Sequence, residues 1–128
     1  MDCIFCSIVK GEIDSAKIWE DNHVLAFLDV HPDTKGHCLV IPKQHCENIF
    51  DIDENLLQKV IVASKKIAEK IKNSLQAEGI NLMSNNGKIA GQIVPHFHIH
   101  IIPRYAEEDL LFNKTPDMNT LKALARQI

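Results

Sequence analysis

The segment from Val94 to Ile102 alternates histidine with large apolar residues. In an extended strand, successive side chains point to opposite faces of the sheet. The alternation therefore predicts a strand from Ile93 to Ile102, ended by Pro103. Its two faces would carry Phe97, Ile99 and Ile101 toward the core and His96, His98 and His100 on the other side. A chain with such a strand must build a sheet and cover its apolar face with a second layer.

A long amphipathic helix is predicted from about Asp53 to Leu75, with Asp51 or Asp53 as its N-cap. Its inward stripe consists of Leu56, Leu57, Val60, Ile61, Ser64, Ile67, Ala68, Ile71 and Leu75. Shorter patterns predict helices over 4–9 and 117–128, strands over 23–28, 36–42 and 80–83, and a polar loop over 84–92. The strands over 23–28 and 36–42 should pair antiparallel. The expected fold is α+β, a mainly antiparallel sheet with helices packed on it, in a single domain spanning 1–128.

Composition narrows the class of protein. The 128 residues are 45% hydrophobic and 24% charged, as in an ordinary globular domain, and the net charge of −3 offers no broad positive field for long nucleic acid. The apolar runs fall short of the roughly 20 residues that cross a bilayer, and nothing after Met1 resembles an export signal. We therefore expect a cytoplasmic protein without a membrane partner, whose four cysteines are thiols or metal ligands rather than disulfides.

Three histidines on one face predict a functional site, because clustered groups that titrate near neutral pH reduce stability. A metal could bind them, but the acidic residues that follow, Glu107, Glu108 and Asp109, lie in no obvious ligand spacing. Alternatively, a neutral imidazole could attack phosphorus without needing a base. The pair Cys3 and Cys6 could bind zinc with two further ligands, form a redox couple or pack in the core.

The run His96–Ile102 resembles the histidine triad family, as do Gly91-Gln92 before it and Pro103-Arg104 after it. Earlier blocks that extend the resemblance over nearly the whole chain are Cys3–Ile8, Ala26–Val30 and His37–His45. The Hint-like nucleotide hydrolases are the most similar branch. The resemblance implies a HIT-like fold, a purine nucleotide or nucleotide conjugate as ligand, and a homodimer paired through the long helix and an edge strand.

The implied activity is hydrolysis of phosphate-linked mononucleotide conjugates: phosphoramidates, adenylyl conjugates or dinucleoside polyphosphates. His98 would be the nucleophile, held by the carbonyl of His96, and form a nucleotidyl-histidine intermediate. His100 would contact the phosphate and the bridging atom, and its charged form would favour the transition state. The implied nucleotide-binding residues are Phe5, Ile8, Phe27 and Val30 around the base, Asp29 at the ribose, and Asn85, Gly91 and Gln92 at the phosphate.

The resemblance also implies structural zinc bound by Cys3, Cys6, His45 and His96. One position departs from the family: Ile93 stands where active members usually have serine or threonine. This favours, as an alternative, a nucleotide-binding protein with little turnover. A different metalloenzyme built on the three histidines is a third hypothesis. Cys38 is expected in the core, whereas the residues left without an assigned role are His23, His31, His37 and Cys46.

Overall fold

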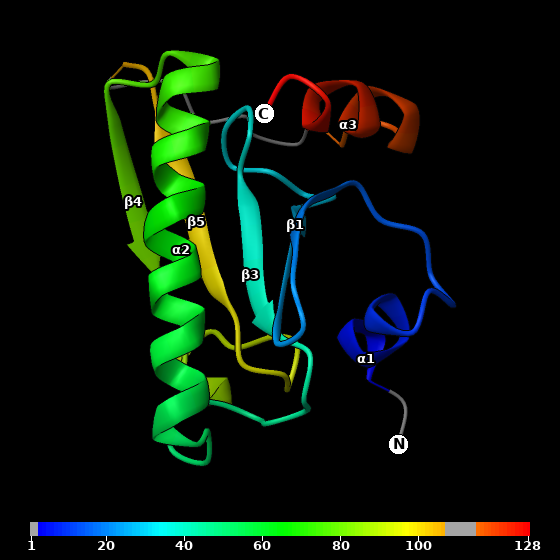
Figure 1. Cartoon of the computed structure of the whole chain (residues 1–128), viewed down its shortest axis with the longest axis vertical. Coiled ribbons are helices and arrows are strands. Elements are labelled where there is room, and N and C mark those ends of the chain that lie inside the picture. Colours follow the sequence, from blue (N-terminus) through cyan, green and yellow to red (C-terminus); the bar gives the residue numbers. More distant parts are fainter. Residues whose placement is uncertain (1–2, 107–114) are drawn as a thin grey trace.

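The computed structural model describes residues 3–106 and 115–128, so the acidic run 107–109 lies outside the described residues. Along the chain the elements are α1 (Ile4–Val9), β1 (Lys17–Glu20), β2 (Val24–Leu28), β3 (Cys38–Pro42), α2 (Glu54–Leu75), β4 (Gly79–Met83), a 3₁₀ turn (Lys88–Ala90), β5 (Ile99–Arg104) and α3 (Met118–Ala125). The five strands form one antiparallel sheet in the order β1-β2-β3-β5-β4. Helix α2 runs along one face of it (Figure 1). The predicted α+β fold is confirmed.

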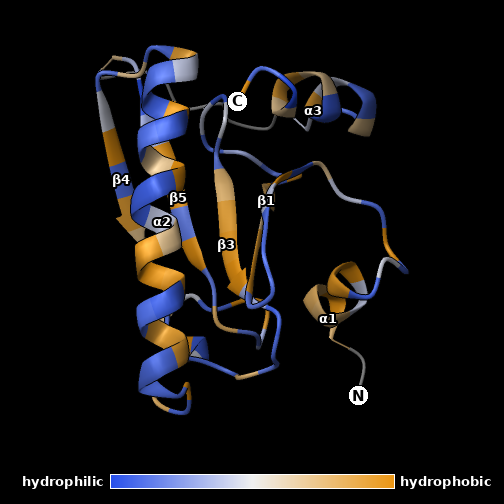
Figure 2. Cartoon of the chain, in the orientation of Figure 1, coloured by the Kyte–Doolittle hydropathy of each residue, from blue (hydrophilic) through white to orange (hydrophobic). Residues whose placement is uncertain are grey.

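The central strands β2 and β3 are buried along their whole length, and alternate residues enter different cores. The larger core lies between the sheet and helices α2 and α3; its strand residues are Val24, Ala26, Leu28, Cys38, Val40, Ile99 and Ile101. The smaller core lies on the α1 face; its members are Cys3, Phe5, Ile8, Leu25, Phe27, Leu39 and Ile41. Figure 2 shows β3 as mostly hydrophobic, whereas α2 is mixed. Within the described residues, the helix that covers this second face is the six-residue α1.

The long helix begins where its sequence predicts. Asp53 is the N-cap, and its carboxylate accepts the backbone N–H of Leu56 at 3.1 Å. The other candidate cap, Asp51, instead accepts the N–H groups of Glu47 and Asn48. At the C-terminus Gln76 adopts a left-handed conformation, a common way to end a helix. α2 packs against β3 and against β5, the strand that carries His100.

The predicted strand from Ile93 to Ile102 is wrong in its first half, because β5 begins only at Ile99. Around Pro95 the N–H of His96 donates to the carbonyl of Val94 at 2.8 Å, a three-residue turn that suits the fixed φ of proline. The strand also continues through Pro103 to Arg104. Proline is tolerated there because the pairing of β5 with β3 has already ended at Ile101. The strand β1 was not predicted.

The two terminal helices match their predictions in position. α1 covers residues 4–9 as expected, and α3 begins after Asp117, whose carboxylate accepts the N–H of Thr120 at 2.8 Å. Cys38 lies fully buried in the larger core, as predicted. Within the described ranges 3–106 and 115–128, no helix has the length and apolar character that a membrane span requires.

Candidate functional site

Two clusters of chemically reactive side chains lie on the α1 side of the sheet. Their histidines come from the segment that leads into β5, from β5 itself, and from the two ends of β3. The predicted alternation survives the irregular start of β5: Phe97, Ile99 and Ile101 enter the α2 core. The rings of His98 and His100 lie side by side, with their centroids 5.0 Å apart. The bent strand therefore still divides its side chains between two faces.

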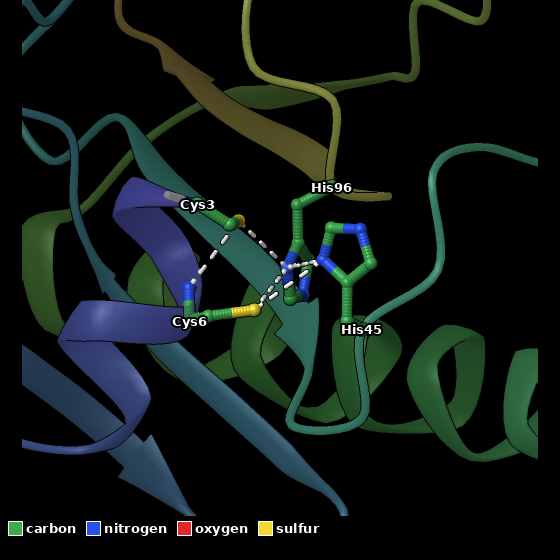
Figure 3. Close-up of side chains that lie close together, drawn as sticks. All are labelled: Cys3, Cys6, His45 and His96. Carbon is green, nitrogen blue, oxygen red and sulfur yellow. Dashed lines mark hydrogen bonds between the residues drawn. The ribbon is translucent and has the colours of Figure 1, made fainter. Parts of the chain in front are cut away.

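The first cluster consists of Cys3, Cys6, His45 and His96 (Figure 3). Cys3 caps α1 and Cys6 lies in its first turn, which brings both thiols to one end of the helix. The Nδ1 atom of His96 lies 3.4 Å from Cys3 Sγ and 3.6 Å from Cys6 Sγ. The Nδ1 atom of His45 lies 3.3 Å from Cys6 Sγ and 3.2 Å from His96 Nδ1. The four donor atoms thus converge on one point.

This donor set fits a tetrahedral zinc ion. Zinc bonds of about 2.3 Å to sulfur and 2.0–2.1 Å to nitrogen separate neighbouring ligands by about 3.3 Å for two nitrogens and about 3.5 Å for nitrogen and sulfur. The protonation of His96 also fits, because its Nε2 lies 2.8 Å from the carbonyl of Pro42 and must donate to it, which leaves Nδ1 with a lone pair. Burial and the neighbouring Cys3 raise the pKa of Cys6, so a pair of thiolates here would need a cation.

The second cluster contains His98, which is 6% exposed and packs its ring against the edge of Phe5. Its Nδ1 lies 2.7 Å from the carbonyl oxygen of His96. A carbonyl can only accept, so Nδ1 carries the hydrogen and Nε2 carries the lone pair in the neutral ring. Burial lowers the pKa of His98, although this bond and the charge of Asp29 oppose the shift. His98 is thus held as a neutral imidazole with one nucleophilic nitrogen.

His37 and His100 form a directed chain of hydrogen bonds. The backbone N–H of Asp33 donates to His37 Nδ1 at 2.9 Å, so the hydrogen of the neutral His37 ring must be on Nε2. That Nε2–H lies 2.9 Å from His100 Nδ1, which must accept it. His100 consequently carries its own hydrogen on Nε2. The role of His37 could not be predicted from the sequence, because its position before β3 gives no sign that its ring meets His100.

The surroundings of His100 disfavour its charged form in the free site. Burial, followed by the neighbouring charges of His98 and His37, lowers the pKa of His100 to about 4, while Asp29 and Asp33 act in the opposite direction. Burial likewise lowers the pKa of His37, against the same two carboxylates. The site therefore presents neutral rings with fixed donors and acceptors.

Asp29, His37 and His100 also lie close enough to suggest a second metal site. The hydrogen bonds argue against it. To bind a metal through Nε2, neutral His37 would have to carry its hydrogen on Nδ1, where the N–H of Asp33 already points. Within the described part of the chain, His96, His98 and His100 do not form a shared donor group either. The cysteine-containing cluster is the candidate metal centre.

The residues expected to hold a nucleoside lie beside the second cluster. Phe5, Ile8 and Phe27 are buried together in the smaller core, with the Phe5 and Phe27 rings in edge contact at 5.5 Å. Val30 lies apart from that core and is 45% exposed. The Asp29 carboxylate accepts the N–H of His31 at 2.9 Å through one oxygen, and its other oxygen lies 3.6 Å from His37 Nε2.

The predicted phosphate loop is braced by Gln92. Its amide oxygen accepts the N–H of Gly87 at 2.8 Å, and its amide nitrogen donates to the carbonyls of Glu47 and Val94. Both amide hydrogens are therefore in use. Gly91 has a φ of +94°, and a β-carbon there would come within 3.6 Å of the Asn85 amide. Asn85 is half-buried and makes no side-chain hydrogen bond to another described residue.

One buried polar residue was missed altogether. Thr34 is fully buried, and its hydroxyl donates to the carbonyl of Pro103 at 2.6 Å, which fastens the loop after β2 to the end of β5. Gly36 in the same loop has a φ of +89° and packs against Leu75 and Pro103. These contacts hold the backbone that orients His37. A contact between positions 69 apart leaves no local sequence pattern.

The fold and the histidine cluster are those of a HIT-like domain. The family model named HIT domain matches residues 10–107. "Protein hit" of Bacillus subtilis is 51% identical over 108 residues, which cover 84% of this chain and 74% of that protein. The adenosine 5′-monophosphoramidase hnt1 of Schizosaccharomyces pombe is 44% identical over 108 residues, covering 84% and 78%. The chain belongs to the HIT family.

Solved structures agree with this assignment. A Hit-like protein of Bartonella henselae superposes with a TM-score of 0.94 at 39% identity, covering 98% of this chain and 93% of that one. A zinc-bound histidine triad family protein of Mycobacterium smegmatis superposes with a TM-score of 0.86 at 36% identity, covering 99% and 95%. The predicted family and fold are thus confirmed.

Proposed function

We propose that the chain is a nucleotide hydrolase or transferase that cleaves phosphate-linked mononucleotide conjugates through a nucleotidyl intermediate on His98. The observation that carries this proposal is the 2.7 Å contact between His98 Nδ1 and the His96 carbonyl, which leaves Nε2 as a nucleophile that needs no base. Relatives in the same family that are named adenosine 5′-monophosphoramidases support it. Phosphoramidates, adenylyl conjugates and dinucleoside polyphosphates all contain an α-phosphorus joined to a leaving group, which is the atom that such a nucleophile would attack.

The reaction would take place in two steps. In the first, Nε2 of His98 bonds to phosphorus and the leaving group departs. In the second, water attacks the phosphorus and returns the electron pair to Nε2, releasing the nucleoside monophosphate. The His96 carbonyl holds the ring in both steps and stabilises the positive charge that the imidazole acquires. The Nε2–H of His100 would donate a hydrogen bond to a phosphate oxygen or to the bridging atom.

The nucleoside would bind next to this histidine pair. We propose that Asp29 accepts hydrogen bonds from the ribose hydroxyls, because its carboxylate is already oriented by the N–H of His31. A purine base would contact the apolar group made of Phe5, Ile8, Phe27 and Val30. The phosphate would lie against Asn85 and the backbone at Gly91. Gln92 would support this loop from behind, or would have to release a backbone carbonyl to contact the phosphate itself.

We also propose that Cys3, Cys6, His45 and His96 bind a structural zinc ion. The support is the convergence of two sulfur and two nitrogen atoms at tetrahedral spacing, together with the zinc-bound relative of the same fold. With four protein ligands, such an ion has no open position for water and only stabilises the fold. His96 would join it to the active site, because the ring faces the thiols while the carbonyl holds His98.

A second function is favoured by one observation. Ile93 is apolar and 91% exposed beside the phosphate loop, so this position supplies no hydroxyl. A nucleotide-binding protein with little turnover would keep the nucleoside contacts and need no such group. The two functions differ in whether AMP is released from a conjugate.

The test is the release of AMP from adenosine 5′-phosphoramidate and from an acyl-adenylate, without added divalent ions. His98→Ala should reduce turnover on the order of 10⁴-fold or more, as expected for the loss of a nucleophile. Binding of AMP should persist, since its base and ribose contacts come from other segments. AMP binding without turnover by the unaltered protein would establish the second function. A fully active His98→Ala variant would eliminate the histidine mechanism.

A further inference from the structure

The two thiols at the start of α1 are placed to react with each other as well as to bind a metal. We infer that Cys3 and Cys6 form a reversible disulfide when a peroxide oxidises them, and that this disulfide opens the metal centre that holds His96. The inference rests on the zinc site of the proposed function. It assigns the cysteine pair a modification that would regulate the neighbouring active site.

The backbone brings the two sulfur atoms together. Cys3 comes directly before α1 and Cys6 lies in its first turn, and the backbone N–H of Cys6 donates to Cys3 Sγ at 3.4 Å. The donor atoms of the cluster, the two sulfurs included, all lie within 4.8 Å of one another. Cysteine pairs with two residues between them form disulfides in many redox proteins. A bond between these sulfurs is therefore compatible with the fold around them.

A hollow in the surface gives a small oxidant access to the pair. It has a volume of about 460 Å³, and its lining includes Cys3 and Cys6, with Ser7 and Lys10 beside them. Cys6 is partly exposed, whereas Cys3 is only 5% exposed. A peroxide molecule is much smaller than this hollow. We therefore expect it to reach Cys6 first, with Cys3 next to the sulfur that has reacted.

The other two cysteines of the chain are kept away from this pair. Cys38 and Cys46 are buried members of the larger core, on the α2 side of the sheet. Cys3 belongs to the smaller core on the opposite side, and Cys6 packs against that core. The sheet thus separates the two groups of thiols. Oxidation of the folded chain should join Cys3 to Cys6 and to no other cysteine.

The modification balances with the peroxide as the oxidant. The sulfur of Cys6 attacks one peroxide oxygen, and the O–O bond breaks to give a sulfenic acid and the first water. The sulfur of Cys3 then attacks the sulfenic sulfur, and the S–S bond forms as the second water departs. The two thiols together lose two electrons and two protons, and the peroxide is reduced to water. A dithiol reductant reverses the change by thiol–disulfide exchange.

A disulfide would remove half of the donor set. Its sulfurs no longer carry the negative charge with which thiolates bind zinc, so the Nδ1 atoms of His45 and His96 would be the donors left. A structural zinc site needs four ligands. The ring of His96 would keep its bond to the Pro42 carbonyl but lose the metal. Because the carbonyl of His96 accepts Nδ1–H of His98 at 2.7 Å, the loss would also reach the proposed nucleophile.

The disulfide would replace little of the stability that the metal centre contributes. A disulfide stabilises a fold mainly by restricting the unfolded chain, and the restriction is small when the loop that it closes is short. The loop from Cys3 to Cys6 contains only two residues between the cysteines. We therefore expect the oxidised protein to melt at a lower temperature than the reduced, zinc-loaded protein, although it has gained a covalent bond.

The test starts from reduced protein supplied with zinc, whose metal content is measured first, and then adds hydrogen peroxide at neutral pH. Intact mass should fall by two hydrogen atoms, and fragmentation should find Cys3 joined to Cys6. About one zinc ion per chain should pass to a chelator in the same interval. AMP release should fall about tenfold or more, the usual size of losing support behind a reactive group. A dithiol reductant with added zinc should restore the mass, the melting temperature and the activity.

Three results would overturn the inference. Both thiols could stay reduced, either one could pass to a sulfinic acid without a disulfide, or the disulfide could form while the zinc stays bound. Disulfide formation and zinc release are measured without any substrate, so they stand apart from the proposed function. Reduced protein that binds zinc but releases no AMP would refute the proposed hydrolase alone. Reduced protein that binds no zinc would refute the zinc site and, with it, the opening of that site.

Two variants test whether the pair alone is responsible. Cys46→Ala removes a thiol outside the cluster and should show the same mass change and the same zinc release as the unaltered chain. Cys6→Ser leaves Cys3 without a partner and should form no disulfide within the chain. If Cys6→Ser does not fold, the location of the bond in the unaltered protein still decides. A disulfide that disappears in Cys46→Ala would overturn the inference.

Discussion

The carbonyl of His96 accepts the Nδ1–H of His98 at 2.7 Å, while the ring of His96 faces the thiols of Cys3 and Cys6. One residue therefore takes part in both clusters, with its backbone in the proposed active site and its side chain in the proposed zinc site. A change that displaces the backbone of His96 would therefore disturb both clusters.

The double variant Cys3→Ser, Cys6→Ser should lose about one zinc ion per chain. Because binding energy at a closed metal site is also folding energy, we expect a loss of several kcal/mol and a melting temperature lower by about 10 °C or more. The kcat of the double variant should also fall, because His96 links the proposed zinc site to the carbonyl that holds His98. Cys46→Ala is the matched control, since Cys46 adjoins His45 but its thiol is not part of the cluster. Metal analysis and thermal unfolding check the prediction; equal stability with and without zinc would refute a structural role.

Stability should decrease as the pH falls from about 6.5 toward 4. His100 has a pKa lowered to about 4 in the folded chain, against about 6.5 when unfolded, so the unfolded chain binds more protons throughout this window. Each such histidine contributes at most about 1.4 kcal/mol per pH unit to the slope. His100→Asn, whose amide oxygen can accept from His37, should show a shallower slope than the unaltered chain. The free energy of unfolding, measured by chemical denaturation at several pH values, gives this slope for each protein. Equal slopes for the unaltered chain and for His100→Asn would contradict the lowered pKa of His100.

Asp29→Asn should weaken the binding of ribonucleotide conjugates more than the binding of their dideoxyribose analogues. The amide keeps one oxygen for the N–H of His31 but loses the charge and the second acceptor. Hydrogen bonds to a charged group contribute roughly 1.5–3 kcal/mol, which corresponds to about a 10- to 100-fold rise in KM for the ribose substrate alone. If KM rises equally for both sugars, Asp29 only supports the loop.

We propose that the chain forms a homodimer through α2 and β4. β4 is an edge strand whose outer side has no partner within the described chain, and an apolar hollow of about 370 Å³ lies beside it. The exposed apolar residues that line it include Ile49, Ile61, Leu82 and Met83. A second copy could cover this surface by two-fold symmetry.

Leu82→Glu should therefore shift the mass measured by light scattering from about twice the 14.5 kDa of one chain to a single chain. Ile13→Glu changes a similarly exposed apolar residue outside this surface and should leave the dimer intact. A monomeric, fully active unaltered protein would exclude the dimer.

The sequence predicted most elements, because periodicity and caps are local. The stripe of α2 and its Asp53 cap, and the pairing of β2 with β3, follow from neighbouring residues alone. The start of β5 was predicted wrongly because alternation continues through the turn at Pro95, where side chains still divide between two faces without strand pairing. Four-residue β1 is too short to show a period.

The site could be predicted only in part, because sequence patterns are local and many of the contacts in the site are not. The donors Cys3, Cys6, His45 and His96 meet where the resemblance implied a metal site. The contacts around His37 could not be predicted in this way. The backbone N–H of Asp33 donates to His37 Nδ1 and so fixes its hydrogen position, and the hydroxyl of Thr34 donates to the distant carbonyl of Pro103 and so holds the loop. Neither residue type marks such a role, and so the neutral state of His100 emerges only from three-dimensional structure.

The most direct test of the account is the intact mass of the protein after brief exposure to an acyl-adenylate, followed by rapid acid-free denaturation. The account predicts a mass increase equal to one adenylyl group, located on His98 by fragmentation and missing in His98→Ala. Turnover of the conjugate with no adduct at any time, or with the adenylyl group on another residue, would contradict it.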